Sequence, residues 1–452
     1  MSKEKPSLPK GTRDFGPDKM IVRNFIISSI RSVFQKYGFL PLETPAMEKL
    51  SVLTGKYGDE GDQLLYKVLN SGDYLSKINT SEIKDAKSLT PKISERGLRY
   101  DLTVPFARFV VMHQHELTFP FKRFQIQPVW RADRPQKGRY REFYQCDADV
   151  VGTNSLLCEV EIILMITEVF EALGINDFEI KINNRKVLEG IAELLGEHTQ
   201  FNALCVAIDK MDKIGLDKVL EELHNQGFSN ESTQRLIPIL QLEGNNNEKS
   251  EALLLHFREA KVNTQGIEEI NYILDYLPEG SSGNVNFDIQ LARGLSYYTG
   301  TIFEVIVNNA SVGSVGGGGR YDNLTGVFGL EGISGVGFSF GLDRLYDVLL
   351  ELGIFNEKER ITTKVMIANF DEESEKYGFK ILQQLRKAGI SSELYPDSSR
   401  LKKQLNYADK KSIPYVILAG ENEIKENNLT LKNMQSGTQE QLSLEELLTI
   451  LK

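Results

Sequence analysis

Two strand-like segments on either side of a basic turn restrict most strongly what this chain can fold into. They are residues 121–133 (FKRFQIQPVWRAD) and residues 139–152 (RYREFYQCDADVVG), which alternate or group aromatic and β-branched residues as strands do. The few residues between them include Pro135 and Gly138, which are typical of a turn. The sequence therefore predicts two strands joined by this turn and, with the strands found further along, a mostly antiparallel body.

The turn concentrates positive charge in an acidic chain. Residues 131–145 hold five cations and two acids, whereas the 452 residues together have a net charge of −10. The cations are Arg131, Arg134, Lys137, Arg139 and Arg141. A charge run is usually a solvated face, and an anion-binding site is the alternative. Both interpretations remain open on these residues alone.

Composition excludes several classes of protein. No apolar run is long enough to cross a bilayer and the N-terminus has no apolar leader, so a cytoplasmic protein without membrane contact is expected. Three scattered cysteines and five histidines without paired spacing predict no His/Cys metal site. Net acidity argues against non-specific nucleic-acid binding over the whole surface, but it is compatible with a local basic groove.

The first part of the chain predicts helices alternating with strands. Residues 21–38 and 158–174 form amphipathic helices that end at glycines. Residues 39–47 form a short strand whose two prolines favour a sheet edge or an interface. Residues 70–97 are polar and broken, which predicts a surface loop.

The second part predicts an insertion, a return to strands and a different tail. Residues 185–280 read as short charged helices inserted in the body. Strands return over 285–307, where QLARGLSYYTG is expected to be a strand bent at Gly294, and a strand followed by a helix is expected over 332–353. From residue 362 onward strands and helices alternate, which predicts a small parallel α/β domain.

Two glycine-rich features are ambiguous on their own. The run around Gly313 and Gly316–Gly319 does not have dinucleotide-binding spacing, so it is a flexible hairpin turn or a place where backbone closely approaches a ligand. Arg344 falls in the first turn of a helix behind a glycine-rich strand, where a guanidinium and free N–H groups can face one anion. An arginine in such a place is more often a surface residue.

In combination these segments resemble the three signature motifs of class II aminoacyl-tRNA synthetases. Five stretches narrow the resemblance to histidyl-tRNA synthetases over nearly the whole chain: LPKGTRDF, RYDLTVPFAR, RPQKGRYREFYQCDADV, LARGLSYYTG and GGGGRYD. The resemblance implies an α+β fold with an antiparallel sheet and flanking helices. It divides the chain into a catalytic domain in two parts (1–184 and 281–356), a helical insertion (185–280) and an anticodon-binding α/β domain (362–452).

The resemblance also implies a reaction and an ATP site. Histidine attacks the α-phosphate of ATP, taken as its magnesium salt, and the histidyl group then passes from the adenylate to the tRNA. Arg131 and Arg293 would be the catalytic cations around the α-phosphate, since the step needs positive charge there. Arg139 would reach the outer phosphates, Phe143 would stack under adenine, and Arg344 would cover its other face.

The histidine site implied by the resemblance needs acceptors for an ammonium and an imidazole. Its residues would be Asp101, Leu102, Thr103, Arg131, Gln145, Asp149, Arg293, Tyr297 and Tyr298. Asp149 and Tyr298 would hold the ring, and Gln145 would share a strand face with Asp149. Without the resemblance, Asp149 reads as an edge-strand acid and Arg293 as an ion pair with Asp288 or Glu304.

Partners and alternatives follow from the same resemblance. A homodimer is expected through the first motif, and tRNA contact through the basic helix RLKKQLNYADKK of the tail. One alternative is a non-catalytic regulatory relative that serves a histidine-biosynthesis phosphoribosyltransferase, although such relatives lack the tail and the ATP arginines. A pure RNA-binding module is the other, and it would not need Asp101, Gln145, Asp149 and Tyr298 together.

Overall fold

The computed structural model describes residues 5–76, 78, 83, 85–197, 200–278, 281–292, 297–355 and 363–452. The chain divides into two compact units, Met1–Ile354 and Phe355–Lys452, each with a sheet of its own. None of the helices in these ranges is long and apolar enough to cross a membrane.

The first unit is built on an eight-stranded sheet of order β1-β5-β6-β11-β10-β9-β7-β8. In chain order the strands are β1 (Leu40–Pro41), β5 (Phe121–Trp130), β6 (Glu142–Val151), β7 (Phe178–Asn184), β8 (Val285–Phe287), β9 (Thr301–Val307), β10 (Gly316–Tyr321) and β11 (Gly335–Gly341). Neighbours run antiparallel except at the two edges, where β1 pairs with β5 and β8 with β7 in parallel. The antiparallel body expected from the sequence is confirmed.

The strand pair around the basic turn is the hairpin β5–β6. Its register runs without interruption from Phe121 opposite Val151 to Trp130 opposite Glu142. β1, the proline-containing strand, lies at the sheet edge as predicted, because proline has no N–H for a second neighbour. The hairpin places the basic turn beyond the end of two adjacent strands, with Arg131 directly after β5.

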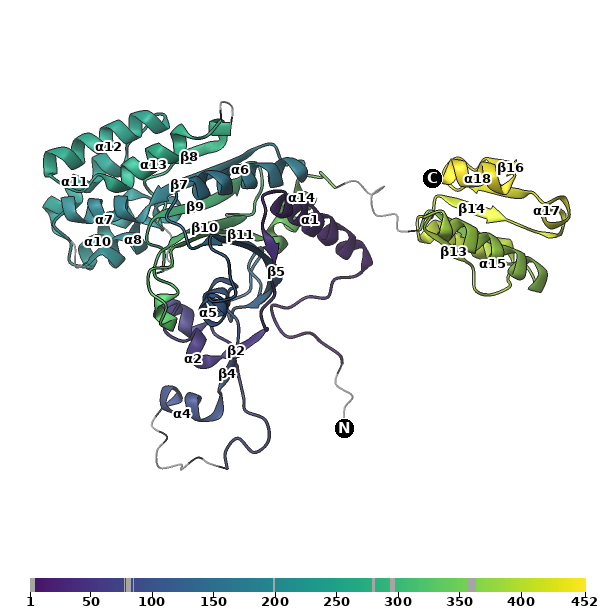
Figure 1. Cartoon of the computed structure of the whole chain (residues 1–452), viewed down its shortest axis with the longest axis horizontal. Coiled ribbons are helices and arrows are strands. Elements are labelled where there is room, and N and C mark those ends of the chain that lie inside the picture. The colour runs from purple at the N-terminus through teal and green to yellow at the C-terminus, as the bar shows by residue number, and fades with distance from the viewer. Residues whose placement is uncertain are drawn as a thin grey trace. The chain divides into compact units, whose positions relative to one another are not determined.

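Helices cover both faces of the sheet (Figure 1). α1 (Pro17–Lys36), α6 (Leu157–Ala172) and α14 (Leu342–Glu351) lie on one face, and α5 (Thr103–His113) lies on the other. Aromatic packing fills the first face, where the ring of Phe34 on α1 lies 5.7 Å from that of Phe124 on β5 and 6.1 Å from that of Phe340 on β11. Burying these rings fixes the hairpin against the helices.

The glycine run Gly316–Gly319 lies in β10, inside the sheet, so the expected hairpin turn is wrong for most of it. A Cβ on Gly318 would lie 2.0 Å from the carbonyl oxygen of Gly337 on β11, and one on Gly319 would lie 2.6 Å from the carbonyl oxygen of Thr301 on β9. The glycines therefore allow close approach, as the other interpretation required, but the atoms nearest to Gly318 and Gly319 belong to the protein's own backbone.

The described residues of the range 70–97 are only partly a surface loop. They include α4 (Ala86–Ile93), whose N-terminus is closed by a capping box between Asp85 and Ser88, and β4 (Arg96–Leu98). β4 lies between β2 (Met47–Lys49) and β3 (Lys67–Val68) in a small three-stranded sheet. The surface-loop interpretation is wrong for these elements because α4 begins with a local cap rather than an apolar periodicity. The short helices α2 (Leu50–Leu53) and α3 (Gly58–Gln63) precede β3.

Short helices account for most of the described residues between 185 and 275, as expected. They are α7 (Arg185–Leu194), α8 (Phe201–Ile208), α9 (Met211–Ile214), α10 (Leu216–Asn225), α11 (Asn230–Leu240), α12 (Asn246–Ala260) and α13 (Gln265–Asp275). α13 packs on α7, β7 and α6, which joins the helical group to the sheet. The strand expected for QLARGLSYYTG is wrong for its described residues, 290–292 and 297–300, which lie outside any strand.

The second unit has a five-stranded sheet of order β13-β12-β14-β15-β16. Its elements are β12 (Val365–Ile367), α15 (Glu372–Lys387), β13 (Ser392–Leu394), α16 (Leu401–Lys410), β14 (Tyr415–Leu418), α17 (Glu421–Glu426), β15 (Leu429–Asn433), β16 (Gln439–Leu442) and α18 (Leu444–Leu451). β12 runs parallel to β13 and β14, which confirms the predicted α/β tail. The antiparallel strands β15 and β16 were not anticipated.

Candidate active site

The sheet face on the side of α5 is polar, in contrast to the aromatic face under α1. Alternate residues of a strand share a face, and on β6 these are Gln145, Asp147 and Asp149. Opposite them lie Gln127, Gln125 and Arg123 on β5, and Gly341, Ser339 and Gly337 on β11. Gln145 and Asp149 therefore share a face, as the strand periodicity required.

Asp149 is buried on this face and held by two neighbours. The Tyr321 hydroxyl donates a hydrogen bond to its Oδ1 at 2.7 Å, and Nη2 of Arg123 lies 2.8 Å from its Oδ2. Gly337 makes room for the carboxyl, because a Cβ there would lie 2.0 Å from Oδ1. Burial raises the pKa of Asp149, and Arg123 opposes the shift. The edge-strand interpretation of Asp149 is wrong, since β6 is an interior strand.

Asp147 is a second buried acid on the same strand face. Burial raises its pKa to about 7, Arg123 lowers it and the charge of Asp149 raises it further. Arg123 compensates this acid less closely than its neighbour, because Nη2 of Arg123 is 3.9 Å from Oδ2 of Asp147. The sheet thus holds two carboxyls against one fully buried guanidinium.

We expect Asp147→Asn to raise the free energy of unfolding, and to raise it more at pH 8 than at pH 5. The native pKa of about 7 lies above the usual pKa of an aspartate, so between the two values the native state binds more protons than the unfolded state. Stability therefore falls as pH rises through this window, and an amide at position 147 removes that loss. Urea unfolding of both proteins at the two pH values measures the difference. An equal effect at both would contradict it.

Asp101 lies just before α5 and presents one free oxygen. Its Oδ1 accepts hydrogen bonds from the Tyr57 hydroxyl at 3.0 Å and from the backbone N–H of Val104 at 3.1 Å. Its Oδ2 is buried and has no hydrogen-bond partner among the described residues. Burial raises the pKa of this carboxyl. Leu102 is buried and Thr103 begins α5, so the three predicted residues mark the start of this helix.

Arg131 is held between two aromatic rings at the end of β5. Its guanidinium carbon lies 4.2 Å from the ring centre of Tyr100 and 5.2 Å from that of Phe143, and its Nε donates a hydrogen bond to the carbonyl oxygen of Tyr100 at 3.1 Å. The structure thus places the predicted residues Arg131 and Phe143 together. Stacking fixes the plane of the guanidinium, which suits recognition of a phosphate or a carboxylate.

The other predicted ATP residues are bonded to the protein itself. Nη2 of Arg139 lies 2.7 Å from Oδ1 of Asp133, and about half of the Arg139 side chain is exposed. Arg344, in the first turn of α14 as predicted, donates from Nε to the carbonyl oxygen of Gly138 at 3.0 Å and from Nη1 to that of Ser314. Arg344 therefore ties the basic turn to the segment before β10.

The two predicted tyrosines lie side by side, with Tyr297 and Tyr298 ring centres 4.8 Å apart. Tyr298 also packs on β10, since a Cβ on Gly319 would lie 2.8 Å from its ring. Burial raises the pKa of Tyr297, and the charges of Tyr298 and Asp101 raise it further, which links this pair to the start of α5. Arg293 lies outside the described residues. Asp288 is one of the two acids considered as an ion-pair partner for Arg293. Its Oδ2 lies 2.9 Å from Nζ of Lys181, with which it forms an ion pair.

Sequence reasoning missed several residues of this face, namely Tyr57, Arg123, Asp147, Tyr321 and Ser339. Asp147 shares a strand face with the predicted residues Gln145 and Asp149, so the period of two could have found it. Arg123 reaches the face through the register of β5 with β6. Tyr321 and Ser339 reach the face only through the register of β10 and β11 with β6. No group of three or more His, Cys, Asp or Glu side chains placed to hold a metal ion occurs among the described residues.

Comparisons with known proteins identify this arrangement. Residues 11–345 match the family model described as Histidyl-tRNA synthetase, and residues 364–452 match the Anticodon binding domain model. The protein named Histidine–tRNA ligase of Cytophaga hutchinsonii is 56% identical to the chain over 446 residues, with 98% of both chains covered. The chain belongs to the histidyl-tRNA synthetase family.

Solved structures agree with membership of the histidyl-tRNA synthetase family. The histidyl-tRNA synthetase from Nostoc sp. PCC 7120 superposes with a TM-score of 0.84 at 34% identity, with 99% of both chains covered. A Bacillus halodurans C protein titled as an ATP phosphoribosyltransferase regulatory subunit/histidyl-tRNA synthetase has a TM-score of 0.70 at 20% identity, covering 90% of this chain and 97% of that one. At that identity the second likeness shows the fold alone.

Proposed function

We propose that this chain is a histidine–tRNA ligase, which activates L-histidine with ATP and transfers it to the 3′ end of its tRNA. The observation that carries the proposal is full-length membership of the family together with a buried polar face that contains the acceptors such a substrate needs. Asp101 and Asp149 are the carboxyls of that face that we propose to bind histidine, and Arg131 is the stacked guanidinium at its rim.

In this proposal the polar face binds histidine. Oδ2 of Asp101 and Oε1 of Gln145 are buried acceptors without a partner among the described residues, which suits them to the α-ammonium. Asp149 accepts a hydrogen bond from the imidazole, with Tyr298 beside it. Leu102, Thr103 and Tyr297 complete the site, and Arg131 and Arg293 receive the carboxylate.

ATP binds along the basic turn. Arg131 bonds the α-phosphate, Phe143 stacks under adenine, and Arg139 reaches the outer phosphates. Arg344 covers the other face of adenine, and releasing its two carbonyl bonds would let the turn adjust to the nucleotide. Arg293 is the second catalytic cation. The magnesium that accompanies ATP is part of that substrate.

Histidine-dependent exchange of pyrophosphate into ATP tests the proposal. The intact chain should catalyse the exchange, and other amino acids in place of histidine should support little of it. The regulatory alternative predicts no exchange by a folded protein that still binds histidine. A folded, histidine-binding chain without exchange would therefore replace the ligase proposal with that alternative.

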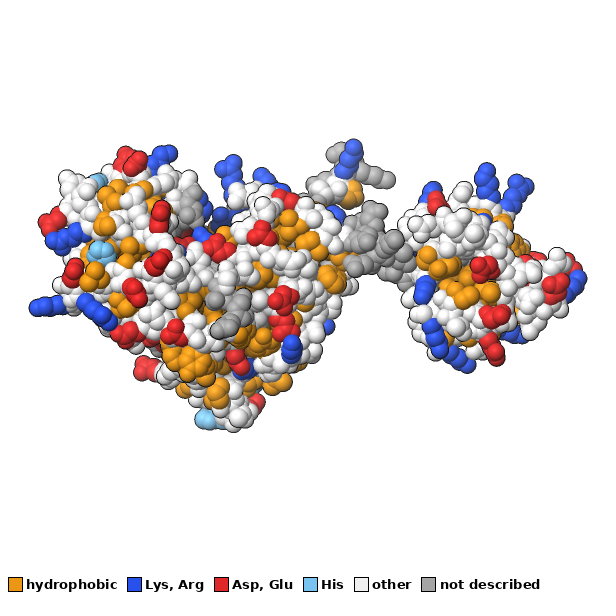
Figure 2. All heavy atoms as spheres, turned by 90° about the horizontal axis from the view of Figure 1, so that it is seen from above, with side chains coloured by type: hydrophobic (Ala, Val, Ile, Leu, Met, Phe, Trp, Pro, Cys, Tyr) orange, Lys and Arg blue, Asp and Glu red, His pale blue; other side chains and the backbone are white. Residues whose placement is uncertain are grey.

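The second unit is proposed to bind the tRNA anticodon. On α16 the exposed side chains include Lys402, Lys403 and Lys410, while Gln404 and Ala408 are buried beneath the helix. Figure 2 shows Lys and Arg side chains projecting from several places on this unit. Exposed ammonium groups on one helix suit contact with successive phosphates.

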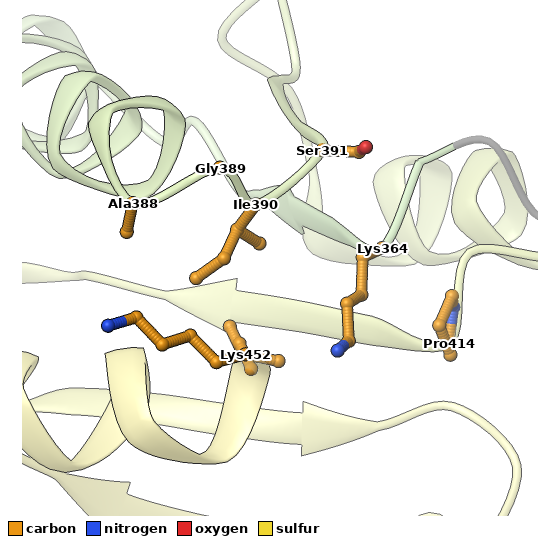
Figure 3. Close-up of a pocket in the computed structure, with 8 residues that line it drawn as sticks. Lys364, Ala388, Gly389, Ile390, Ser391, Pro414 and Lys452 are labelled. Atoms are coloured by element: carbon orange, nitrogen blue, oxygen red, sulfur yellow. The ribbon is translucent and has the colours of Figure 1, made fainter.

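A hollow in the same unit lies between the turn after α15 and the end of α18 (Figure 3). Lys364 and Lys452 line it together with residues 388–391, Pro414 and Leu451. Both are exposed or half-exposed cations, so they add to the positive charge available to RNA. The residues that line the hollow all belong to the second unit, and none of them has a carboxyl side chain.

We expect deletion of residues 362–452 to abolish efficient tRNA charging while pyrophosphate exchange persists at least in part. The eight-stranded sheet lies wholly within the first unit, so we do not expect adenylate formation to require the tail. Initial rates of tRNA charging and of pyrophosphate exchange, measured on the deletion variant and on the intact chain, test this prediction. Charging that stays efficient and anticodon-selective without the tail would contradict the assignment.

The remaining proposals concern assembly and organisation. A homodimer through the first motif is supported by exposed apolar side chains around β1, β2 and the end of α5, namely Leu40, Met47 and Met112.

Residues 1–184 and 281–356 are proposed as one catalytic domain, 185–280 as its insertion and 362–452 as the anticodon-binding domain. We place the enzyme in the cytoplasm, where its tRNA substrate is used.

A further inference from the structure

The stretch LPKGTRDF contributes to the family resemblance, but none of its residues has a place in the histidine and ATP sites proposed above. Its residues 9–15, here called the N-terminal strap, contact the basic turn. The backbone N–H of Arg141 donates to the carbonyl oxygen of Gly11 at 2.9 Å, and Nη1 of Arg141 donates to that of Lys10 at 3.3 Å. A Cβ on Gly11 would lie 2.9 Å from Cγ of Pro135, so the strap and the turn pack directly on each other.

Arg13 is the strap residue that joins the turn to the rest of the fold. Its guanidinium carbon lies 3.2 Å from the ring centre of Tyr140 in the turn. Its Nη2 forms an ion pair with Oδ1 of Asp343, the second residue of α14. Nη1 of Arg23 on α1 lies 2.6 Å from the same oxygen, and Oδ2 of Asp343 accepts from the backbone N–H of Tyr144 at 2.9 Å. The buried carboxyl of Asp343 thus connects the strap, α1, α14 and the start of β6.

We infer that Arg13 is a positioning residue for ATP, which holds the basic turn against α14 while the nucleotide binds. The inference rests on the proposed function, in which Arg344 leaves the turn to cover adenine. In the structure Arg344 holds the turn by donating to the carbonyl oxygen of Gly138. When that bond is released, other contacts must keep the turn ordered, because ordering a loose turn costs conformational entropy on binding. Lys137 donates to the Ser311 hydroxyl from the tip of the turn, but at an exposed position where such a contact contributes little.

The contacts of Arg13 do not involve Arg344 and can therefore persist when ATP binds. The ring of Tyr140 on which Arg13 lies is held from its other end, because its hydroxyl donates to Oδ2 of Asp347 on α14 at 3.0 Å. Tyr140 directly follows Arg139, which is proposed to reach the outer phosphates. Fixing the Tyr140 ring between the strap and α14 restricts the backbone from which the Arg139 side chain extends. Arg13 thus acts on ATP binding through the turn, without touching the nucleotide.

Steady-state pyrophosphate exchange by Arg13→Ala tests the inference. The KM for ATP should rise about tenfold, because the variant loses a cation–π contact and a partly buried ion pair. The KM for histidine should change much less, since histidine is proposed to bind on the sheet face under α5. The fold should be preserved, because Asp343 keeps the buried Arg23 as its partner and the Arg13 side chain is 25% exposed. Equal increases in both KM values would show general damage and overturn the inference.

Lys19→Ala is the matched control for the loss of a positive charge near the N-terminus. Lys19 is exposed in the first turn of α1, so its removal changes the net charge by the same amount. Its KM for ATP should stay near that of the wild type. A rise as large as that of Arg13→Ala would show a long-range effect of charge and overturn the inference.

A double-mutant cycle tests whether Arg13 acts through Tyr140. Tyr140→Leu removes the ring and should itself raise the KM for ATP. In that background Arg13→Ala should add less than it does in the wild type, because the stacked contact is already gone. Independent, multiplicative effects would overturn the inference. Tyr140→Leu also carries the comparison of ATP with histidine if Arg13→Ala does not fold.

Amide hydrogen–deuterium exchange measures the order of the turn without any activity. In the absence of ATP, residues 132–141 should exchange faster in Arg13→Ala than in the wild type, whereas residues 145–151 of β6 should not. An unchanged rate in the turn would overturn the inference. Absence of pyrophosphate exchange by the wild type would remove the proposed function, whereas a normal KM for ATP in Arg13→Ala of an active enzyme would remove only this inference.

Discussion

Arg131→Ala should lower the rate of adenylate formation about a hundredfold, a loss of roughly 3 kcal/mol of transition-state stabilisation. Its guanidinium lies between the rings of Tyr100 and Phe143, where it can bond a phosphate without first being ordered. The fold should be preserved, because the bond that holds the turn there runs from the backbone N–H of Arg131 to the carbonyl oxygen of Arg141.

Single-turnover formation of histidyl-adenylate measures this loss directly. Arg134→Ala is the matched control, because Arg134 lies in the same turn with an exposed side chain, and its rate should stay near that of the wild type. Arg131→Lys keeps the charge but not the planar fork, so it should fall between the two. An Arg131→Ala enzyme as active as the control would remove Arg131 from the site.

Asp149→Ala should raise the KM for histidine by about a hundredfold or more and leave the KM for ATP almost unchanged. A site built on a hydrogen bond loses most of its affinity when the buried acceptor is removed, because the donor of the ligand is then left unpaired. The Asp149 carboxyl is buried on an interior strand of the sheet. It lies on the same strand face as Gln145.

Asp149→Ala should also lower the stability of the fold, so the loss of stability must be measured separately from the loss of histidine binding. Removing Asp149 leaves the more distant Asp147 as the ion-pair partner of the buried Arg123 guanidinium among the described residues, and stranding a buried charge commonly costs about 3–5 kcal/mol of stability. Tyr321→Phe removes a hydrogen bond to the same carboxyl but keeps the charge, so it should affect histidine binding much less. Equal damage to histidine and ATP binding in Asp149→Ala would indicate a structural role for Asp149.

Local patterns in the sequence were sufficient for the elements that carry their own signals. The hairpin β5–β6 follows from alternation around a turn, and α1 and α6 follow from an apolar face ended by a glycine. β10 was misread because a glycine run lacks side chains to show a period, so its place in the sheet depends on the neighbours that need the space. α4 was missed because its start is defined by a cap of two polar residues.

Local sequence patterns could not predict the contacts of the polar face, because these contacts depend on the register between strands. Tyr321 and Asp149 are 172 residues apart, and Gln145 and Ser339 are 194 residues apart. Periodicity placed Gln145 and Asp149 on one face, but their partners come from β10 and β11, whose order beside β6 no short stretch encodes. The functional residues were named from family resemblance, and their neighbours only from the structure.

Gly337 limits how this site could be redesigned for another amino acid. Any side chain there would collide with Oδ1 of Asp149, and Gly319 is closed in the same way by Tyr298 and the carbonyl of Thr301. A library that varies these floor positions would yield mostly misfolded members unless Asp149 were shortened at the same time. Gln145 and Asp101 should stay unchanged, because every amino acid has the α-ammonium that they are proposed to bind. Useful diversity therefore lies at Tyr298, which is proposed to lie beside the imidazole.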